Sequence, residues 1–280
     1  MRGSVAAEFL LLRKRTSTWI LLGIWTALAA FFSYLLPYVE YRNGDLGGGP
    51  GEVPLEELLP DRLAGQLSGG FPFFGGVFAL MLGVLALGSE YGWGTLRTVL
   101  VQRPGRLQVF AAKLIALGAG LVPFVLAVFL VGTVSSYAIA RSEGVEVTWP
   151  SAWDVIRAFG ASWLILAVWA ALGIALGVLT RGTSLAIGVG ILYALVIEGL
   201  LSAFADQVSL LEPLVEFFLR ANAYSLVEGL GASSTSAATD GPGAFNGPYV
   251  GGEQALIVLT VYLAAFLVVS GLLLRRRDVT

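Results

Sequence analysis

FPFFGGVFALMLGVLAL at residues 71–87, SEYGWGTLRTVLVQRPGRLQVFAAK at 89–113 and LIALGAGLVPFVLAVFLVGTVSSYAIA at 114–140 follow one another and decide the fold of this chain. A helix needs about 20 predominantly apolar residues to cross the hydrocarbon core of a bilayer. The first and third stretches are close to that length or exceed it, so we expect each to span a membrane. The middle stretch is basic and much longer than a connection between two helices requires.

Composition extends this expectation to the whole chain. Hydrophobic residues make up 56% of the 280 residues and charged residues 13%, against roughly 45–50% and about 25% in soluble domains. The predicted spans are 19–36, 71–87, 114–140, 158–179, 184–201 and 255–274. We therefore expect an all-α membrane protein with six transmembrane helices, forming a single domain over residues 1–280.

The distribution of basic residues predicts the orientation. With a cytoplasmic N-terminus, 12 of the 17 Lys and Arg residues fall in inner segments, and the opposite topology would reverse this split. Inner loops of membrane proteins carry an excess of Lys and Arg. Both termini are thus expected in the cytoplasm of a multi-pass protein of the cell membrane.

The N-terminal residues are expected to be retained, because their charges follow the first apolar residues and no cleavable signal has that order. Residues 4–15 are typical of a helix that lies in the membrane interface, with Phe9 on its apolar face and Arg13, Lys14 and Arg15 at its basic end. A simple flanking anchor is the alternative.

Three outer loops are expected, at 37–70, 141–157 and 205–253. The first is rich in Gly, Pro and acidic residues, a composition that predicts a flexible cap. In the third, Glu212, Glu216 and Arg220 recur every four residues, which predicts an amphipathic helix, either re-entrant or lying on the surface. The Gly- and Ser-rich remainder of that loop is typical of a flexible linker.

The inner segment 89–113 has the features of a short helix held at both ends. Gly92 and Gly94 loosen the backbone after the second span, and a helix can restart before the basic turn that Arg103 and Arg106 border. A basic loop that only enforces topology is the alternative. The candidate docking residues are Glu90, Gly92, Trp93, Gly94, Thr95, Leu96, Arg97, Arg103 and Arg106.

This pattern resembles the first cytoplasmic loop of the type-2 ABC exporter permeases, the six-span subunits that pair with a separate ATPase. The N-terminal basic segment, the outer helical segment before the last span and the C-terminal Arg-Arg-Arg-Asp fit the same plan. The resemblance implies that residues 93–107 form the coupling helix that enters a cleft of the ATPase. It also implies that residues 4–15 form the connecting helix beside it.

The resemblance implies partners as well, because the chain contains no G-x-x-x-x-G-K-[ST] sequence with which to hold nucleotide phosphates. ATP and magnesium would be bound by the partner ATPase, and this chain would need no cofactor. A second permease, either another copy or a homologue, would complete the translocation path within the bilayer. We expect a hydrophobic or amphipathic substrate (a drug, peptide or lipid) and no nucleic-acid partner.

Glu198 is the one carboxylate inside a predicted span. Ionisable groups at membrane depth are costly and often functional, so Glu198 is a candidate for lining or gating the path. It also lies near the outer end of its span. There it can instead reach the headgroups or pair with Arg157 or Arg220.

Two other classes of protein compete with this interpretation. A membrane-embedded enzyme would lack the usual groups, since the chain has no His and no Cys and its predicted spans contain no Asp. A channel or secondary transporter working alone would be expected to show several polar groups at mid-membrane or an inverted repeat. We see neither pattern in the sequence.

Overall fold

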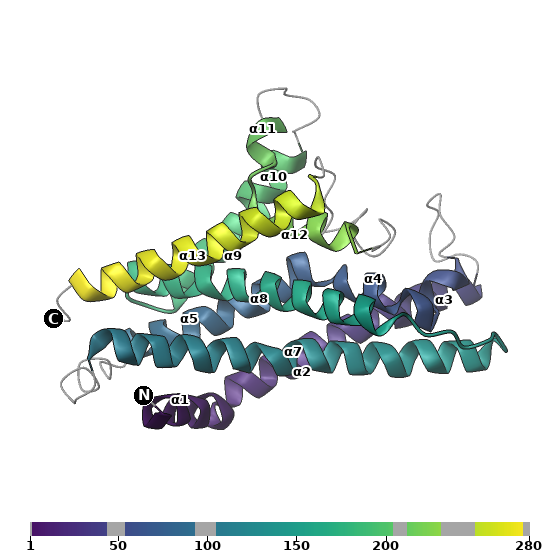
Figure 1. The fold of residues 1–280 in the computed structure, drawn as a ribbon, viewed down its shortest axis with the longest axis horizontal. Coiled ribbons are helices and arrows are strands. Elements are labelled where there is room, and N and C mark those ends of the chain that lie inside the picture. The colour runs from purple at the N-terminus through teal and green to yellow at the C-terminus, as the bar shows by residue number, and fades with distance from the viewer. Residues whose placement is uncertain (1, 44–53, 93–104, 204–211, 231–249, 277–280) are drawn as a thin grey trace.

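A computed structural model describes residues 2–43, 54–92, 105–203, 212–230 and 250–276, and these residues form helices, turns and short connections without a strand. Four helices are long and apolar enough to cross a membrane: Thr16–Arg42, Leu107–Ser142, Ala152–Thr180 and Gly252–Arg275. They contain four of the six predicted spans. Figure 1 shows them side by side as the frame of the molecule.

The first of these helices is built from α2 (Thr16–Ala30), the π-helical turn η1 (Phe31–Leu35) and α3 (Leu36–Asn43). The other three are α7 (Arg106–Ser142), α8 (Ala152–Thr180) and α13 (Gly252–Arg276). A short helix, α1 (Arg2–Lys14), precedes them and ends where Arg15 adopts an extended conformation.

The other two predicted spans are also helical, but each contains a π-helical turn. The span predicted at 71–87 is η4 (Phe71–Gly75) followed by α5 (Gly76–Gly92), in which the apolar part, Gly76–Ser89, is short. The span predicted at 184–201 is α9 (Ser184–Leu192), η5 (Tyr193–Ile197) and α10 (Glu198–Ala203). Six membrane crossings remain a prediction.

The core lies along the crossing of α5 and α8. A side chain at Gly83 would overlap the backbone of Ala170, and one at Gly173 would overlap the carbonyl of Leu80. Small residues allow two helices in a membrane to approach this closely. Large side chains such as Trp169 and Ile165 fill the space around the crossing and are fully buried.

Local sequence explains where α8 begins and ends. Ser151 is its N-cap: the backbone N–H of Asp154 donates to Ser151 Oγ at 3.2 Å, and Ser151 Oγ donates to Asp154 Oδ2 at 2.7 Å. A side-chain oxygen at this position satisfies a backbone donor that has no partner within the helix. At the other end, Arg181 takes a left-handed conformation with φ of 54°, which stops the helix before α9.

The described part of the first outer loop corrects our expectation of a flexible cap, whereas its Gly-rich residues 44–53 lie outside the described residues. Residues 55–68 fold into η2 (Leu55–Leu58), η3 (Pro60–Arg62) and α4 (Leu63–Ser68), and every residue of α4 is buried. The loop is acidic and Gly-rich overall, but it also contains leucines that the core can bury. Leu58, Leu63 and Leu67 are at most 3% exposed, and their burial holds this segment in place.

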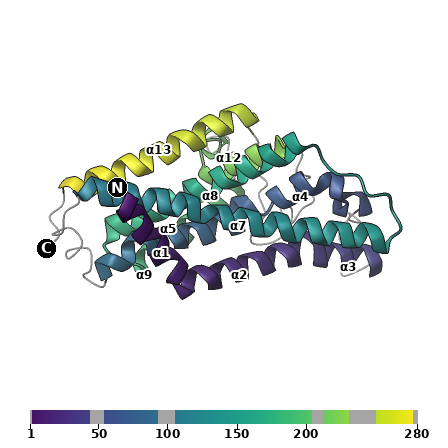
Figure 2. The ribbon, with the colours of Figure 1, turned by 60° about the horizontal axis from the view of Figure 1, so that its bottom comes forward.

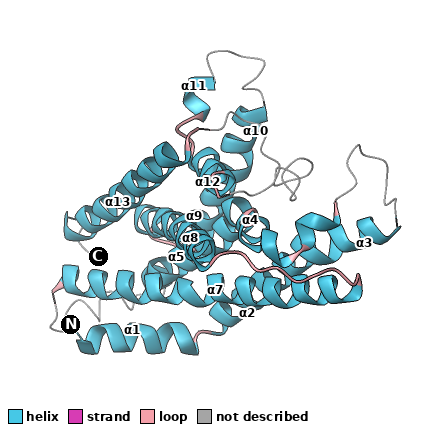
Figure 3. Ribbon diagram, turned by 45° about the vertical axis from the view of Figure 1, so that its right-hand side comes forward, coloured by secondary structure: helices cyan, strands magenta, loops and turns pink. Residues whose placement is uncertain are grey.

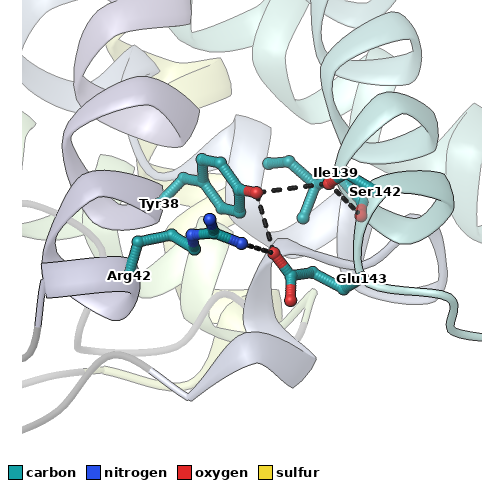
Figure 4. A network of polar contacts seen from close by, with 5 residues as sticks. All are labelled: Tyr38, Arg42, Ile139, Ser142 and Glu143. Carbon is teal, nitrogen blue, oxygen red and sulfur yellow. Dashed lines mark hydrogen bonds and ion pairs between the residues drawn. The ribbon is translucent and has the colours of Figure 1, made fainter.

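A polar network fastens the end of α3 to the end of α7 (Figure 4). The Tyr38 hydroxyl donates to Glu143 Oε1 at 2.8 Å, and Arg42 Nη1 donates to the same oxygen at 3.1 Å. Ser142 Oγ lies 3.2 Å from the Tyr38 hydroxyl and donates to the carbonyl of Ile139. The ends of the first and third predicted spans are thereby linked.

The other end of the bundle gathers the chain termini. The first residues of α1, the end of α5, the start of α7 and the end of α13 lie together at the left of Figure 1. The two described ends of the chain therefore lie at the same end of the bundle. The prediction that this end is cytoplasmic rests on the basic residues alone.

The outer segment before α13 is helical, but it is not the single stripe that the sequence predicted. It consists of α11 (Glu212–Val215), a turn, and α12 (Leu219–Glu228). Phe218 is extended and separates the two helices, so Glu216 and Arg220 do not lie on one helical face. Residues 219–227 are all buried, whereas an amphipathic surface helix would expose one face.

Candidate functional site

The predicted docking segment begins and ends on described helices. Glu90 and Gly92 are in the last turn of α5, and Arg106 is the first residue of α7. Trp93, Gly94, Thr95, Leu96, Arg97 and Arg103 lie outside the described residues. The structure thus shows the two helices that carry the segment, and the contacts that hold those helices.

Arg15 binds the first of these helices. Its Nη1 donates to the carbonyl of Leu85 at 2.7 Å, and its Nη2 donates to Ser89 Oγ at 3.0 Å. Ser89 Oγ in turn donates to the Leu85 carbonyl at 2.6 Å. Hydrogen bonds from an ionised donor are stronger than neutral ones, so the residue between α1 and α2 is fixed to the end of α5.

Glu8 binds the second helix. Lys113 Nζ donates to Glu8 Oε1 at 2.7 Å, and the Lys113 side chain is only 4% exposed. The side chain of Leu12 lies against Gly120 on the same helix, so α1 packs along α7 (Figure 2). The N-terminal segment therefore contacts both helices that border the predicted docking residues.

Three of the residues predicted for the interfacial helix are exposed. Phe9 is 43% exposed, and Arg13 and Lys14 are also exposed. The indole N–H of Trp19 donates to the carbonyl of Arg13 at 2.8 Å and fixes the bend between α1 and α2. An apolar side chain beside two exposed cations is the pattern that suits a lipid interface, although α1 also lies against protein.

Replacing Glu8 with Gln is expected to loosen α1 from α7. The change leaves the ammonium of the buried Lys113 without its carboxylate partner, and such a loss costs about 1–3 kcal/mol. Limited trypsin digestion after Arg13 and Lys14 should then become several-fold faster in the purified protein. Charge exchange in the double variant Glu8→Lys, Lys113→Glu should restore resistance at Arg13 and Lys14, with cleavage after the new lysine at position 8 counted separately. Equal digestion of the wild type and Glu8→Gln would contradict the role of this pair.

The carboxylate of Glu198 is fully buried and both of its oxygens have donors. Oε1 accepts from the backbone N–H of Leu219 at 2.9 Å and from the Tyr193 hydroxyl at 2.5 Å. Oε2 accepts from the backbone N–H of Arg220 at 3.0 Å. Glu198 thus caps the N-terminus of α12 from another helix. Its predicted role in lining or gating a path stays a prediction.

Arg220 is the one of the two predicted arginine partners that meets Glu198. It contributes its backbone N–H, while its guanidinium Nη1 lies 3.4 Å from the carbonyl of Ala194 and its side chain is 2% exposed. Ala194 belongs to the π-helical turn that precedes Glu198. In all three of these hydrogen bonds α12 supplies the donor, and residues 194–198 supply the acceptor.

Sequence reasoning missed Glu8, Lys113 and Tyr193 as functional candidates. One signal was available for Glu8, which is the sole acidic residue among the first 39. An isolated carboxylate beside a basic segment suggests a specific partner. No comparable signal marks Tyr193, because its position in a π-helical turn is not encoded by any local motif that we recognise.

The described residues contain no cluster of acidic side chains able to hold a metal ion. A cavity between α2 and α4, lined by Trp25, Ser33 and Gln66 among others, has a volume of about 20 Å³. This is room for about one water molecule. It is far too small for a transported drug, peptide or lipid.

Comparison with models of known protein families gives a match. The family model described as "ABC-2 family transporter protein" matches residues 56–279, which is most of the chain. No curated protein matches the sequence significantly. The match begins after the first predicted span and includes every predicted docking residue and Glu198.

Proposed function

Because the chain belongs to the ABC-2 family of transporter proteins, we propose that it is the permease subunit of an ATP-driven exporter and couples to a separate ATPase through residues 93–107. The family match carries this proposal. It identifies a membrane transport component, and this family normally works with an ATPase subunit. The absence of a phosphate-binding motif from the sequence agrees with that division of labour.

The contacts of α1 support the proposed docking site. A force applied at residues 93–107 acts on the ends of α5 and α7, and these ends are held by Arg15 and by Glu8. α5 is packed without space against α8. Movement at the docking site would therefore be passed to the core as a shift of whole helices, because close-packed interfaces do not deform continuously.

In the proposed complex the partner ATPase binds ATP and magnesium. In this chain Arg97, Arg103 and Arg106 would pair with acidic side chains of the ATPase. The orientation that follows has both termini in the cytoplasm and α12 at the outer side of the cell membrane, in accordance with the basic residues.

The proposed substrate is hydrophobic or amphipathic, and the path is proposed to form between two permeases. The largely apolar predicted spans support a substrate of this kind. The second permease is a copy of this chain or a homologue. The alternative is a channel or secondary transporter that works alone, and a membrane-embedded enzyme is less well supported.

Reconstitution separates these alternatives. The chain, purified with the ATPase encoded nearest to its gene and placed in proteoliposomes, should hydrolyse ATP faster when candidate drugs, peptides or lipids are added. Proteoliposomes with the chain alone should transport nothing. Transport that proceeds at the same rate without the ATPase and ATP would overturn the proposed function in favour of a stand-alone transporter.

A further inference from the structure

We infer that Glu198 is a positioning residue that fastens α12 to the helical segment 184–203, and that transport requires this fastening. α12 contains several buried polar side chains. They include Arg220, Asn222 and Ser225, which are at most 2% exposed. A helix with this much buried polarity is held by specific hydrogen bonds as well as by apolar contact.

Glu198 accepts two of these hydrogen bonds with a single carboxylate. Its two oxygens accept the N–H groups of consecutive residues, Leu219 and Arg220, at the start of α12. These N–H groups have no acceptor within the helix, and the positive end of the helix dipole favours a carboxylate at this place. No residue of α12 supplies its own side-chain cap, because the N-cap position is Phe218.

The π-helical turn η5 gives the fastening its geometry. The backbone N–H of Glu198 donates to the carbonyl of Tyr193, five residues earlier. In a regular α-helix it would instead donate to Ala194, four residues earlier. In this structure the carbonyl of Ala194 lies 3.4 Å from the guanidinium of Arg220. The wide turn thus leaves Ala194 in contact with α12 and brings the hydroxyl of Tyr193 to Glu198.

Two further contacts hold α12 and the turn before it from the other side. The Tyr262 hydroxyl on α13 donates to the carbonyl of Phe217 at 2.8 Å. The backbone N–H of Val250 donates to Ser225 Oγ at 3.0 Å. These contacts come from the last predicted span and the residues before it, so α12 lies between two segments (Figure 3). Among the described residues, Glu198 connects the N-terminal N–H groups of α12 to the helical segment 184–203.

The chain has no cysteine, so a single introduced cysteine is the one thiol that a maleimide can label. Rates are compared within one reporter background, because Ser225→Cys itself changes the contact with Val250. We propose Ser225→Cys as a reporter within α12 and Ser162→Cys, equally buried in α8, as the control position. The rate of reaction with a maleimide in detergent measures how often each position is uncovered. In detergent both sides of the protein are accessible, so the result does not depend on orientation or on an ATPase.

With the Ser225→Cys reporter, Glu198→Ala should accelerate labelling by about tenfold or more, because two buried backbone donors lose their acceptor. Glu198→Gln retains one acceptor oxygen and should give an intermediate rate. Tyr193→Phe leaves both backbone contacts of Glu198 in place and should change the rate by less than about threefold. The Ser162→Cys position should react slowly in every background.

Two outcomes overturn the inference. One is an unchanged rate at Ser225→Cys in the Glu198→Ala protein. The other is equal acceleration at Ser162→Cys, which would show general loosening.

The second half of the inference rests on the proposed function. In proteoliposomes with the ATPase, Glu198→Ala should retain ATP hydrolysis and lose transport, with partial recovery in Glu198→Gln. Normal transport despite faster labelling would overturn only this half and leave the fastening established.

Discussion

Replacing Gly83 with alanine is expected to separate α5 from α8 and to destabilise the whole protein. A Cβ atom at this position would overlap the carbonyl oxygen of Ala170, and backbone atoms of a packed helix cannot move aside as a flexible side chain can. Overpacking a core costs typically 1–3 kcal/mol, and we expect about 3 kcal/mol because the clash is with backbone. The protein should unfold at a clearly lower temperature in detergent and yield less monodisperse material.

Gly160→Ala is the matched control for this prediction. It lies on α8 as well, but a Cβ atom there would meet nothing within 4 Å. Alanine is a better helix former than glycine by about 1 kcal/mol, so this variant should be as stable as the wild type or slightly more stable. Equal melting temperatures for Gly83→Ala and Gly160→Ala would show that the close crossing of α5 and α8 is wrong.

Reversing the charge at Arg97 and Arg106 together is expected to uncouple ATP hydrolysis from transport. In the proposed complex these side chains face acidic groups of the ATPase, so Glu at both positions replaces attraction by repulsion, and like charges in contact cost several kcal/mol. Transport by the reconstituted complex should fall by about a hundredfold, while membrane insertion and the melting temperature of the chain should not change.

Arg141→Glu serves as the control for this charge reversal. Arg141 lies in the last turn of α7, at the opposite end of the helix that Arg106 begins. Its replacement should leave transport within about twofold of the wild type, as expected for a surface charge far from the docking segment. Unchanged transport in the Arg97→Glu, Arg106→Glu variant would remove the docking assignment.

The fold was predictable where a local pattern decides the structure. The predicted span 158–179 lies within α8, and its true start at Ala152 follows from the Ser151 cap, a pattern that sequence alone carries. The two predicted spans that lie outside the four long helices contain π-helical turns, and the first predicted span contains one as well. Their geometry depends on contacts with distant segments, such as the stacking of Phe32 from η1 on Phe74 from η4.

The candidate site was predictable only in part, for a similar reason. The costly burial of a carboxylate marked Glu198, but its partners Leu219 and Arg220 are 21 and 22 residues away and offer backbone N–H groups, which every residue has. The stripe of Glu212, Glu216 and Arg220 predicted one amphipathic helix. Once Glu198 supplies a cap from outside, the chain can break at Phe218 and bury α12 instead.

Photo-crosslinking from position 97 in native membranes tests the central claim most directly. A benzophenone attached to Arg97→Cys, in a chain that has no other cysteine, should crosslink to a protein that carries a G-x-x-x-x-G-K-[ST] sequence. The same probe at Trp149→Cys, in the connection between the other end of α7 and the start of α8, should not reach that protein. A crosslink to the ATPase from position 149 and none from position 97 would contradict the account.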